Sequence, residues 1–508
     1  MRYVASREEM QNIDAYSINN VGIPGIVLME KAALALEEVF LERIPTDSRV
    51  LIVTEKGNNG GDGLALGRLL LEEGYTVDFY EIGVIPHASD SHQIQKHILE
   101  QMEADFLMKF PEEEYDVIVD AIFGVGLKRE VAGRHREVIE RLNQMEALKV
   151  AVDVPSGVDA STGQILGIAF EADLTVTFGL PKVGLLLYPG ADVSGEVIVK
   201  EIGFPNKAVE EIAPQMISFT SEDLQKLPER KAWTNKGSYG KVLLIAGSKN
   251  MAGAALLSGT AAYKSGSGLV RIFSCEENRV ILQEKLPEAI LTTYDSEEKA
   301  WELLPECLSW ASVIGIGPGI GQSDFAKRLV KQVLALGKAP LVIDADGLNN
   351  LAVLLKEDAE LKQLFHEYEG GMILTPHLKE MFRLTGEEIA EIRSNLPKAA
   401  ASIADKGHVI VLKDARTIVS DGSVPSYINM SGNNGMATGG SGDVLTGIIC
   451  GFLAGGLDIL TAARLGVYCH GLAGDAAAKE KGYYSVLAGD LTNYLETILK
   501  RKHFPEKK

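Results

Sequence analysis

The segment 433–445 (NNGMATGGSGDVL) joins a glycine-rich turn to an apolar helix and places one carboxylate, Asp443, near the start of that helix. Backbone N–H groups in such a turn, together with the positive end of the helix, can stabilise the charge of a phosphate. A carboxylate in the first helical turn can also take a proton from an attacking hydroxyl. Asp443 could instead be a helix cap, but the glycines around it exceed what a cap requires. The segment therefore favours phosphoryl chemistry.

Polar segments also follow predicted strands elsewhere in the second half: 315–321 (GIGPGIG), 344–349 (DADGLN), 374–377 (LTPH) and 413–417 (KDART). The glycine run does not match GxGxxG, because Ile320 occupies the place of the last glycine, so a dinucleotide-binding fold of that type is not predicted. His377 lies in a Thr-Pro turn, which suits a ligand contact, although a capping histidine is the simpler alternative. Lys413 and Arg416 could meet the phosphates or the sugar of a nucleotide.

The first half contains a comparable segment, 57–63 (GNNGGDG), between a predicted strand and a predicted helix. It matches neither the phosphate-loop pattern, which needs a lysine, nor GxGxxG. Its glycines would still let the backbone approach a ligand, and N–H groups at the start of the helix could hold a phosphate. A tight turn capped by Asn or Asp is the alternative interpretation.

Two more strand ends of the first half carry polar residues: 120–129 (DAIFGVGLKR) and 152–159 (VDVPSGVD). In an open α/β sheet, ligands bind outside the carboxyl ends of the strands, where all three segments would meet. Oxygen atoms of Asn59, Asp120 and Ser156 could together ligate a hard cation, and Lys128 could meet an anionic ligand. Each aspartate alone would be an ordinary turn residue, but three such strand ends favour a site.

Short apolar runs that alternate with amphipathic stretches must position these segments. This βαβ pattern of continuous Val, Ile and Leu predicts mostly parallel sheets that are covered by helices on both faces. The pattern lapses once, in a stretch rich in Pro, Glu and Lys, so we predict two tandem three-layer α/β domains, 1–209 and 210–508. The predicted strands are 50–54, 77–80, 117–119, 150–152, 174–178 and 197–199, and then 241–245, 269–273, 313–316, 341–343, 372–374 and 409–412.

The composition restricts the classes of partner. The 508 residues carry 50 Lys and Arg against 70 Asp and Glu, and the net charge of −20 opposes binding to nucleic acids and to anionic membranes. The four cysteines are too far apart for a CxxC pair, so neither a disulfide framework nor a structural zinc site is expected. The N-terminus lacks the apolar run of a secretory signal, and the most apolar stretch, 444–457, is too short for a membrane span. We therefore expect a cytoplasmic protein in which 444–457 is a buried helix.

Together, GNNGGDG, DAIFGVGLKR and VDVPSGVD resemble the motifs of the NAD(P)H-hydrate epimerase family, over about residues 1–207. The resemblance implies a Rossmann-like three-layer fold that binds hydrated NADH or NADPH and K⁺ and interconverts the R and S forms at the hydrated nicotinamide carbon. It implies potassium ligands at Asn59, Asp120 and Ser156, and it leaves Asp62, Asp120 and Lys128 open as the group that moves the proton. The implied substrate contacts are Asn58, Asn59, Gly60, Gly61, Asp62, Gly124, Val125, Gly126, Leu127, Lys128, Arg129, Glu130 and Asp153.

In the second half, TNKGSYGKVLLIAGS, GPGIG, DADGLN, LTPH, KDART and TGGSGDVL resemble the ADP/ATP-dependent NAD(P)H-hydrate dehydratase family, of the ribokinase-like fold, over about residues 221–499. The implied reaction transfers phosphate from ADP or ATP to the hydroxyl of the S hydrate, and loss of that phosphate regenerates NADH or NADPH. Asp443 is implied as the general base, and Mg²⁺ would help to neutralise the phosphate charge. The implied hydrate contacts are Ala254, Gly319, His377 and Asp443, and the implied nucleotide contacts are Lys413, Asp414, Ala415, Arg416, Thr417 and Gly442.

Two residues depart from the dehydratase pattern. Asp414 stands where the family more often has Gly, and Ser441 stands where Thr is common. A carboxylate beside phosphates weakens binding unless it points away or binds the metal. The choice between ADP and ATP therefore stays open.

The combined interpretation is a bifunctional enzyme that repairs damaged NADH and NADPH, and we expect it to form a homo-oligomer. The alternative is a ribokinase-like small-molecule kinase fused to a dinucleotide-binding module. A third hypothesis makes the first half a dinucleotide sensor that binds without turnover. These hypotheses differ in the product they predict, so each is open to a direct assay.

Overall fold

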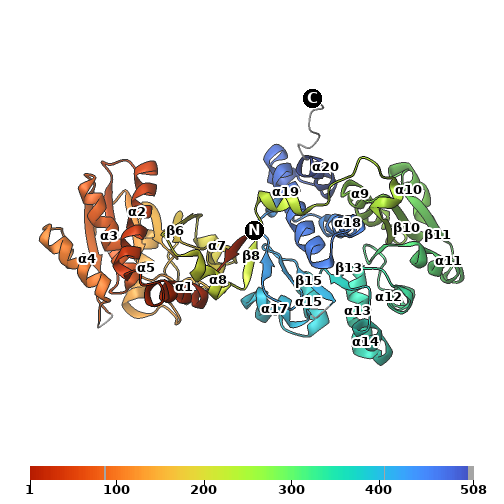
Figure 1. The fold of residues 1–508 in the computed structure, drawn as a ribbon, viewed down its shortest axis with the longest axis horizontal. Coiled ribbons are helices and arrows are strands. Elements are labelled where there is room, and N and C mark those ends of the chain that lie inside the picture. The colour runs from red at the N-terminus through yellow and green to blue at the C-terminus, as the bar shows by residue number, and fades with distance from the viewer. Residues whose placement is uncertain (85–86, 405–406, 501–508) are drawn as a thin grey trace. The chain divides into compact units, whose positions relative to one another are not determined.

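The computed structural model describes residues 1–84, 87–404 and 407–500, and the chain divides into two compact units (Figure 1). The N-terminal unit is Tyr3–Met216, and the C-terminal unit is Ile217–Lys508 together with Met1–Arg2. The boundary predicted at 209/210 falls inside helix α8 (Asn206–Ile212), which stays with the N-terminal unit. Both boundaries between the units fall inside short strands. One lies in β1 (Arg2–Val4) and the other in β8 (Met216–Ser218).

The N-terminal unit is built on a six-stranded parallel sheet, as the apolar runs predict. The strand order is β3-β2-β4-β5-β6-β7, so the chain starts in the interior of the sheet and reverses direction between β3 and β4. Ligand sites of open parallel sheets lie at such a reversal, outside the carboxyl ends of the strands. The strands are β2 (Arg49–Thr54), β3 (Thr76–Glu81), β4 (Val117–Ala121), β5 (Leu148–Val152), β6 (Leu174–Phe178) and β7 (Glu196–Lys200).

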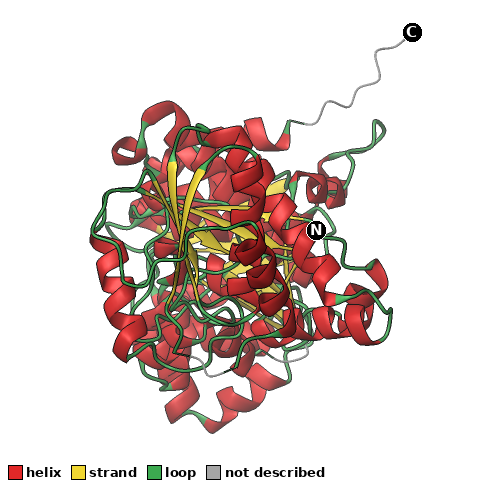
Figure 2. Ribbon diagram, turned by 90° about the vertical axis from the view of Figure 1, so that its left-hand side faces the viewer, coloured by secondary structure: helices red, strands yellow, loops and turns green. Residues whose placement is uncertain are grey.

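Successive residues of these strands face opposite helix layers, which makes the unit three layers thick (Figures 1 and 2). In β2, Val50 and Ile52 pack with residues of α2 (Gly25–Arg43) and α3 (Asn58–Glu72). Leu51 and Val53 belong to a second apolar cluster, which includes residues of α5 (Gly133–Gln144). Burial on both faces explains why the strands read as continuous apolar runs. The other helices are α1 (Arg7–Asn19), α4 (Asp90–Gln101), α6 (Val183–Leu186) and α7 (Gly190–Val193).

The C-terminal unit is built on a longer sheet, in which the strands beyond β1 and β8 follow the order β17-β16-β15-β14-β13-β12-β9-β10-β11. The strands from β11 to β15 pair in parallel, whereas β15, β16 and β17 pair antiparallel. The reversal of strand order lies at β9, between β10 and β12. The strands are β9 (Lys241–Ile245), β10 (Leu269–Cys275), β11 (Ile290–Tyr294), β12 (Val313–Ile316), β13 (Leu341–Ile343), β14 (Met372–Leu374), β15 (His408–Leu412), β16 (Ile418–Ser420) and β17 (Ser426–Ile428).

Helices cover this sheet on both faces. A Cβ on Gly315 of β12 would meet Cys450 in α18, whereas the neighbouring Ile314 lies against Gly337 at the end of α12. Helix α18 also packs closely on α9, because a Cβ on Gly447 would lie 2.2 Å from the backbone oxygen of Ser258. The helices are α9 (Ala252–Lys264), α10 (Arg279–Lys285), α11 (Glu297–Trp310), α12 (Asp324–Leu336), α13 (Asp346–Glu357), α14 (Ala359–His366), α15 (Leu378–Thr385), α16 (Ile389–Ser394), α17 (Leu396–Ser402), α18 (Ser441–Ala454), α19 (Ile459–Lys481) and α20 (Ala488–Leu499).

The apolar stretch 444–457 includes most of α18, and the side chains of α18 from Val444 to Ala454 are buried. The prediction of a buried helix is therefore confirmed for this part of the chain. Within the described ranges, none of the helices combines the length and the apolar character that a membrane span requires.

Candidate active sites

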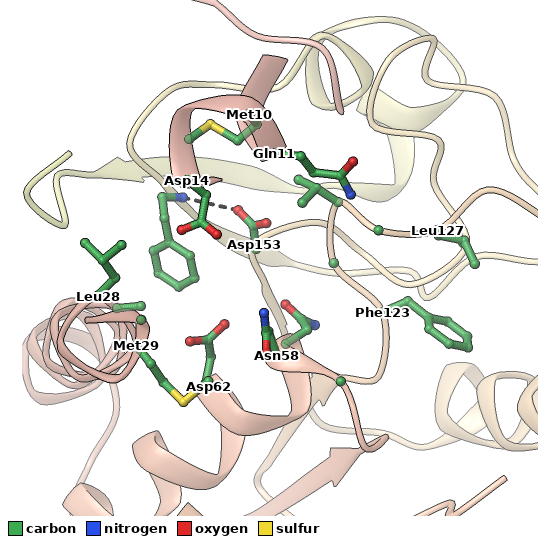
Figure 3. Close-up of a pocket in the computed structure, with 18 of the residues that line it drawn as sticks. Met10, Gln11, Asp14, Leu28, Met29, Asn58, Asp62, Phe123, Leu127 and Asp153 are labelled. Atoms are coloured by element: carbon green, nitrogen blue, oxygen red, sulfur yellow. Dashed lines mark hydrogen bonds between the residues drawn. The ribbon is translucent and has the colours of Figure 1, made fainter. Parts of the chain in front are cut away.

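A cavity of about 680 Å³ opens at the carboxyl ends of β4, β5 and β6 in the N-terminal unit (Figure 3). It brings together the start of α3, the loop that follows β4 and the end of β5, as the positions of the three motifs predict. Helices α1 and α2 supply another part of its wall, including Met10, Asp14 and Met29. Predicted contacts that line the cavity are Asn58, Asn59, Asp62, Gly124, Val125, Gly126, Leu127, Lys128, Arg129 and Asp153.

Three predicted contacts, Gly60, Gly61 and Glu130, do not line this cavity. Glu130 is exposed. The two glycines serve packing: a Cβ on Gly60 would lie 1.7 Å from the backbone oxygen of Glu55, and a Cβ on Gly61 would lie 2.5 Å from Cε of Met29. Both glycines therefore allow the first turn of α3 to approach its neighbours. That turn has no side-chain cap at Gly57, so its N–H groups are free to meet an anion.

Gly60→Ala should destabilise the N-terminal unit by about 2 kcal/mol, because the added methyl group meets backbone rather than a movable side chain. Gly126→Ala is the matched control, since a Cβ there meets nothing within 4 Å. Far-UV circular dichroism during urea unfolding reports on both units. Fluorescence reports on the C-terminal unit alone, which holds all three tryptophans, Trp233, Trp301 and Trp310. Equal unfolding midpoints for the two variants would contradict the packing role of Gly60.

Three carboxylates line the same cavity: Asp14 from α1, Asp62 from α3 and Asp153 after β5 (Figure 3). Burial, together with the charges of Asp153 and Asp14, raises the pKa of Asp62 well above its ordinary value. Burial and Asp153 also raise the pKa of Asp14. The arrangement therefore favours a protonated Asp62, which could deliver a proton to a ligand in the cavity.

Lys182 compensates the charge of Asp153. Its Nζ donates to Oδ1 of Asp153 at 2.6 Å, to Oγ1 of Thr177 at 2.9 Å and to the backbone oxygen of Phe178 at 2.8 Å, while the residue is 1% exposed. Burial lowers the pKa of Lys182, and Asp153 opposes that effect. Among the described residues, all hydrogen bonds to the Asp153 carboxylate end on Oδ1, which leaves Oδ2 for a ligand. Asp153 itself has φ of +65°, a conformation that Asp and Asn adopt more readily than most residues.

The predicted potassium ligands lie around one loop, 122–124. The buried Asp120 carboxylate accepts from the Ser156 hydroxyl at 2.6 Å and from the Ser156 N–H at 2.7 Å, and the Ser156 hydroxyl accepts from the N–H of Phe123 at 2.8 Å. Asn59 lies on the other side of the loop, because a Cβ on Gly124 would be 2.7 Å from Oδ1 of Asn59. Burial raises the pKa of Asp120 to about 6, although the hydrogen bonds from Ser156 and Ile122 oppose it.

These donors fit a monovalent cation by chemistry, since they are a carboxylate, a hydroxyl and an amide oxygen beside carbonyl groups. The side-chain nitrogen of Asn59 is buried without a hydrogen-bond partner, so this side chain is not saturated by the protein. In the described ranges, no group of three or more His, Cys, Asp and Glu side chains could hold a transition metal. Lys128, the other predicted proton carrier, is exposed at the rim.

In the C-terminal unit, Asp443 lies in the first turn of α18, after the glycine turn. Gly440 is the N-cap, with φ of +91° and no side-chain cap, so N–H groups at this helix start remain for a ligand. Burial and the charges of Asp344 and Asp346 raise the pKa of Asp443 to about 6, against the opposing effect of Lys413. A carboxylate with this pKa is ionised at neutral pH and can still accept a proton.

Lys413 brings the predicted nucleotide segment to the same place. A Cβ on Gly442 would lie 3.4 Å from its Nζ, which donates to Oδ1 of Asp344 at 2.8 Å. The rest of the segment, from Asp414 to Thr417, forms the connection between β15 and β16, where Ala415 is exposed. The structure thus brings Lys413 to Gly442 and Asp443, which lie in a later part of the sequence.

Two other predicted hydrate contacts are also neighbours. Gly319 has φ of +65°, and a Cβ on it would lie 2.9 Å from Cβ of Ala254. Gly319 follows β12 and Ala254 is in the first turn of α9, so both stand where the strand order reverses. The absence of a side chain at Gly319 therefore allows this loop to approach the start of α9 closely.

His377 caps helix α15. Its Nδ1 accepts from the N–H groups of Lys379 at 3.1 Å and Glu380 at 3.2 Å, while Oε2 of Glu380 accepts from the N–H of His377 at 2.9 Å. Because Nδ1 is an acceptor, a neutral ring carries its proton on Nε2. Burial and Lys413 lower the pKa of His377, which favours this neutral form. The capping interpretation is therefore correct, and Nε2 of the same ring lies 3.3 Å from Oε1 of Glu380.

Several residues of both regions were not predicted as site residues. Asp14 and Lys182 lie in the first cavity, and Asp344, Glu380 and Asp475 hold the second region together. A signal existed for Lys182, because it follows β6 as the chosen motifs follow β4 and β5. None existed for Asp14 and Asp475, which only tertiary packing brings from helices α1 and α19.

Comparison with known proteins gives matches over nearly the whole chain. A family described as NAD(P)H-hydrate dehydratase matches residues 242–497, and a family described as YjeF-related protein N-terminus matches residues 25–184. The bifunctional NAD(P)H-hydrate repair enzyme of Moorella thermoacetica is 38% identical over 98% of this chain and 97% of its own.

Two solved structures resemble the C-terminal part of the chain. A ribokinase-like superfamily protein from Enterococcus faecalis is 31% identical, with a TM-score of 0.50, over 56% of this chain and 95% of its own. The ADP/ATP-dependent NAD(P)H-hydrate dehydratase of Bacillus subtilis, co-crystallised with ATP and Mg²⁺, is 32% identical, with a TM-score of 0.48, over 55% of this chain and 96% of its own.

Proposed function

This chain belongs to the family of bifunctional NAD(P)H-hydrate repair enzymes, and on that premise we propose that its N-terminal unit epimerises hydrated NADH or NADPH while its C-terminal unit dehydrates the S form. The observation that carries the proposal is the pair of strand-end sites, one in each unit. Each combines uncapped helix N–H groups with a carboxylate whose pKa is raised. The first suits an exchange of protons, and the second suits a transfer of phosphate.

The hydrated ring carbon is bonded to the ring nitrogen, so its hydroxyl can leave as water once it has taken a proton. The nitrogen lone pair then forms a C=N bond, and water that adds to the opposite face releases a proton and gives the other epimer. Asp62, which burial keeps protonated, would donate the proton to the leaving hydroxyl. Asp153, whose charge Lys182 balances, would accept the proton from the attacking water through Oδ2.

Potassium would be held by Asn59, Asp120 and Ser156, the three oxygen-bearing residues around the loop 122–124. The cation would supply positive charge near this loop, which also lines the cavity. Epimerisation is tested with the full chain and one pure epimer in the absence of any nucleotide, so that dehydration does not consume the product. We expect the R and S peaks to approach a constant ratio faster with potassium than with lithium. Binding that stabilises the chain without exchange of the peaks would favour the sensor hypothesis instead.

In the second reaction Asp443 would take the proton of the hydrate hydroxyl as its oxygen attacks the terminal phosphorus of ADP or ATP. The bond from that phosphorus to the nucleotide breaks. The phosphorylated hydrate then loses phosphate together with a proton from the adjacent ring carbon, and the C=C bond that forms regenerates the dihydronicotinamide. Lys413, Arg416 and the N–H groups at the start of α18 would hold the phosphates. Mg²⁺ would enter with the nucleotide and neutralise part of the phosphate charge.

The rate of dehydration should fall as the pH decreases through about 6, because Asp443 must be ionised to act as the base and its pKa is about 6. Initial rates at low hydrate concentration, followed by dihydronicotinamide absorbance from about pH 5 to about pH 8, give the acid limb of kcat/KM. An acid limb with its midpoint near pH 6 is the expected result. A rate that stays constant across this range would contradict the assignment of the base.

The dehydratase assignment is tested by adding hydrated NADH and, separately, hydrated NADPH with each nucleotide. Recovery of dihydronicotinamide absorbance supports repair, whereas a phosphorylated product that accumulates would favour the small-molecule kinase. Homo-oligomerisation and a cytoplasmic location remain predictions from the sequence. Light scattering of the purified chain would test the first of them.

A further inference from the structure

Asp344 connects three elements of the dehydratase region, although the proposed chemistry gives it no part. It follows β13 and is 1% exposed. Its Oδ1 accepts from Oγ1 of Thr375 at 2.6 Å and from Nζ of Lys413 at 2.8 Å, and its Oδ2 accepts from Oγ1 of Thr446 at 2.8 Å. Thr375 and Lys413 follow β14 and β15, whereas Thr446 belongs to α18. One buried carboxylate thus ties two neighbouring strand ends to the helix that carries Asp443.

The same carboxylate lies against the turn that should receive phosphate. A Cβ on Gly442 would be 3.6 Å from Oδ2 of Asp344 and 3.4 Å from Nζ of Lys413. An ionised carboxylate is costly to bury, and at this position it would also repel phosphate. Three hydrogen bonds could have been made by uncharged groups at a lower cost. The negative charge of Asp344 therefore indicates a role beyond packing.

We propose that Asp344 is a positioning residue of the dehydration reaction, which fixes the Lys413 ammonium and the Asp443 carboxylate in the geometry that phosphoryl transfer needs. Lys413 is a long, flexible side chain whose ammonium has three donors. With one donor held by Asp344, the remaining donors can point toward the phosphates. Thr446 follows Asp443 within the first turns of α18. The hydrogen bond from Thr446 to Asp344 therefore fixes the start of this helix, and with it the position of Asp443. This inference rests on the proposed dehydratase function.

If the proposal is correct, a change of the Asp344 charge should change the pKa of Asp443. Asp344 and Asp346 raise the pKa of Asp443, and Lys413 lowers it. Three other titratable groups lie at neighbouring helices. His470 belongs to α19, and its Nε2 is 3.3 Å from the hydroxyl of Ser441, while His377 and Glu380 form a pair at α15. Burial lowers the pKa of His470 to about 4 and raises the pKa of Glu380 to about 7. The Glu380 carboxyl, with a pKa of about 7, therefore titrates in a pH range next to that of Asp443.

Asp344→Asn in the full chain tests the proposal, because it removes the charge and keeps the size of the side chain. We expect the maximal kcat to fall about tenfold and the acid limb of kcat/KM to move to lower pH by about half a unit, since Asp443 loses a neighbouring negative charge. Loss of packing alone would lower the rate without this shift. A folded variant with an unmoved acid limb would overturn the proposal.

Thr446→Val keeps the charge of Asp344 and removes only its bond to α18. We expect kcat to fall about threefold to tenfold with the acid limb at its wild-type position. Thr492→Val is the matched control, because Thr492 is also buried in a helix and its hydroxyl donates to the backbone oxygen of Gly489 in α20. Wild-type kcat in Thr446→Val would overturn the anchoring of α18 even if Asp344→Asn does not fold.

A wrong function and a wrong role of Asp344 would give different results. If the proposed function is wrong, the wild-type chain produces no dihydronicotinamide absorbance with either nucleotide. If only the inference is wrong, the wild-type chain is active and the variants lack the expected shift and the expected loss of kcat. Tryptophan fluorescence checks the fold of each variant, because all tryptophans lie in the unit that carries Asp344.

Discussion

Asp443→Asn should lower kcat for dehydration by about a thousandfold, while the Kd of the nucleotide stays within about threefold of the wild-type value. The amide keeps the size of the carboxylate at the start of α18, so the glycine turn and its N–H groups remain in place. It cannot accept a proton, because the pKa of a protonated amide is far below the working range. Initial rates of dihydronicotinamide recovery give kcat, and calorimetric titration with ADP or ATP gives the Kd.

Asp324→Asn provides the matched control. Asp324 is likewise a first-turn aspartate of a helix in the C-terminal unit, but its side chain is exposed and forms an ion pair with Lys327. Its rate should stay within about twofold of the wild type, as usual for a surface substitution. Epimerisation without nucleotide should be unaffected in both variants, because that site is in the other unit. A rate within tenfold of wild type in Asp443→Asn would remove Asp443 as the base.

The fold could be predicted largely because buried strands of parallel sheets must be apolar on both faces. The runs at 50–54 and 241–245 coincide with β2 and β9. The edge strand β11 was missed, since its sequence, ILTTY, is only partly buried and has no need of a continuous apolar run. The short antiparallel strands β16 and β17 were also missed, because three residues are too few to show a period.

From the sequence, site residues could be predicted mainly in segments that directly follow a predicted strand. Glycines that face a ligand and glycines that face another backbone look identical in a sequence, so the sequence does not show that Gly60 packs against the backbone of Glu55. His377 shows a second limit, because the same side chain caps α15 with Nδ1 and contacts the Glu380 carboxylate with Nε2. A sequence pattern that is matched to one role of a residue does not show that the residue has a second role. Only the packing of α1 against the sheet shows that Asp14 belongs to the cavity.

Lys182→Met should destabilise the N-terminal unit by about 3 to 5 kcal/mol and abolish epimerisation, because it leaves the charge of Asp153 without its buried partner. The methionine fills a similar volume, so the loss is electrostatic rather than a cavity. In urea, far-UV circular dichroism should show an earlier transition. Tryptophan fluorescence should be unchanged, since the tryptophans are in the C-terminal unit. Dehydration of the pure S hydrate should also continue at the wild-type rate.

The double variant Asp153→Asn and Lys182→Met separates stability from chemistry. Asn keeps an oxygen for the Thr177 hydroxyl and accepts the positive φ of this position, and with Lys182 replaced no unpaired charge is buried. Most of the lost stability should therefore return, so that the two substitutions are strongly non-additive. Epimerisation should remain absent, because neither a carboxylate nor its counter-charge is left at the end of β5. Additive destabilisation would mean that the pair is not coupled, and recovered epimerisation would show that Asp153 does not carry the proton.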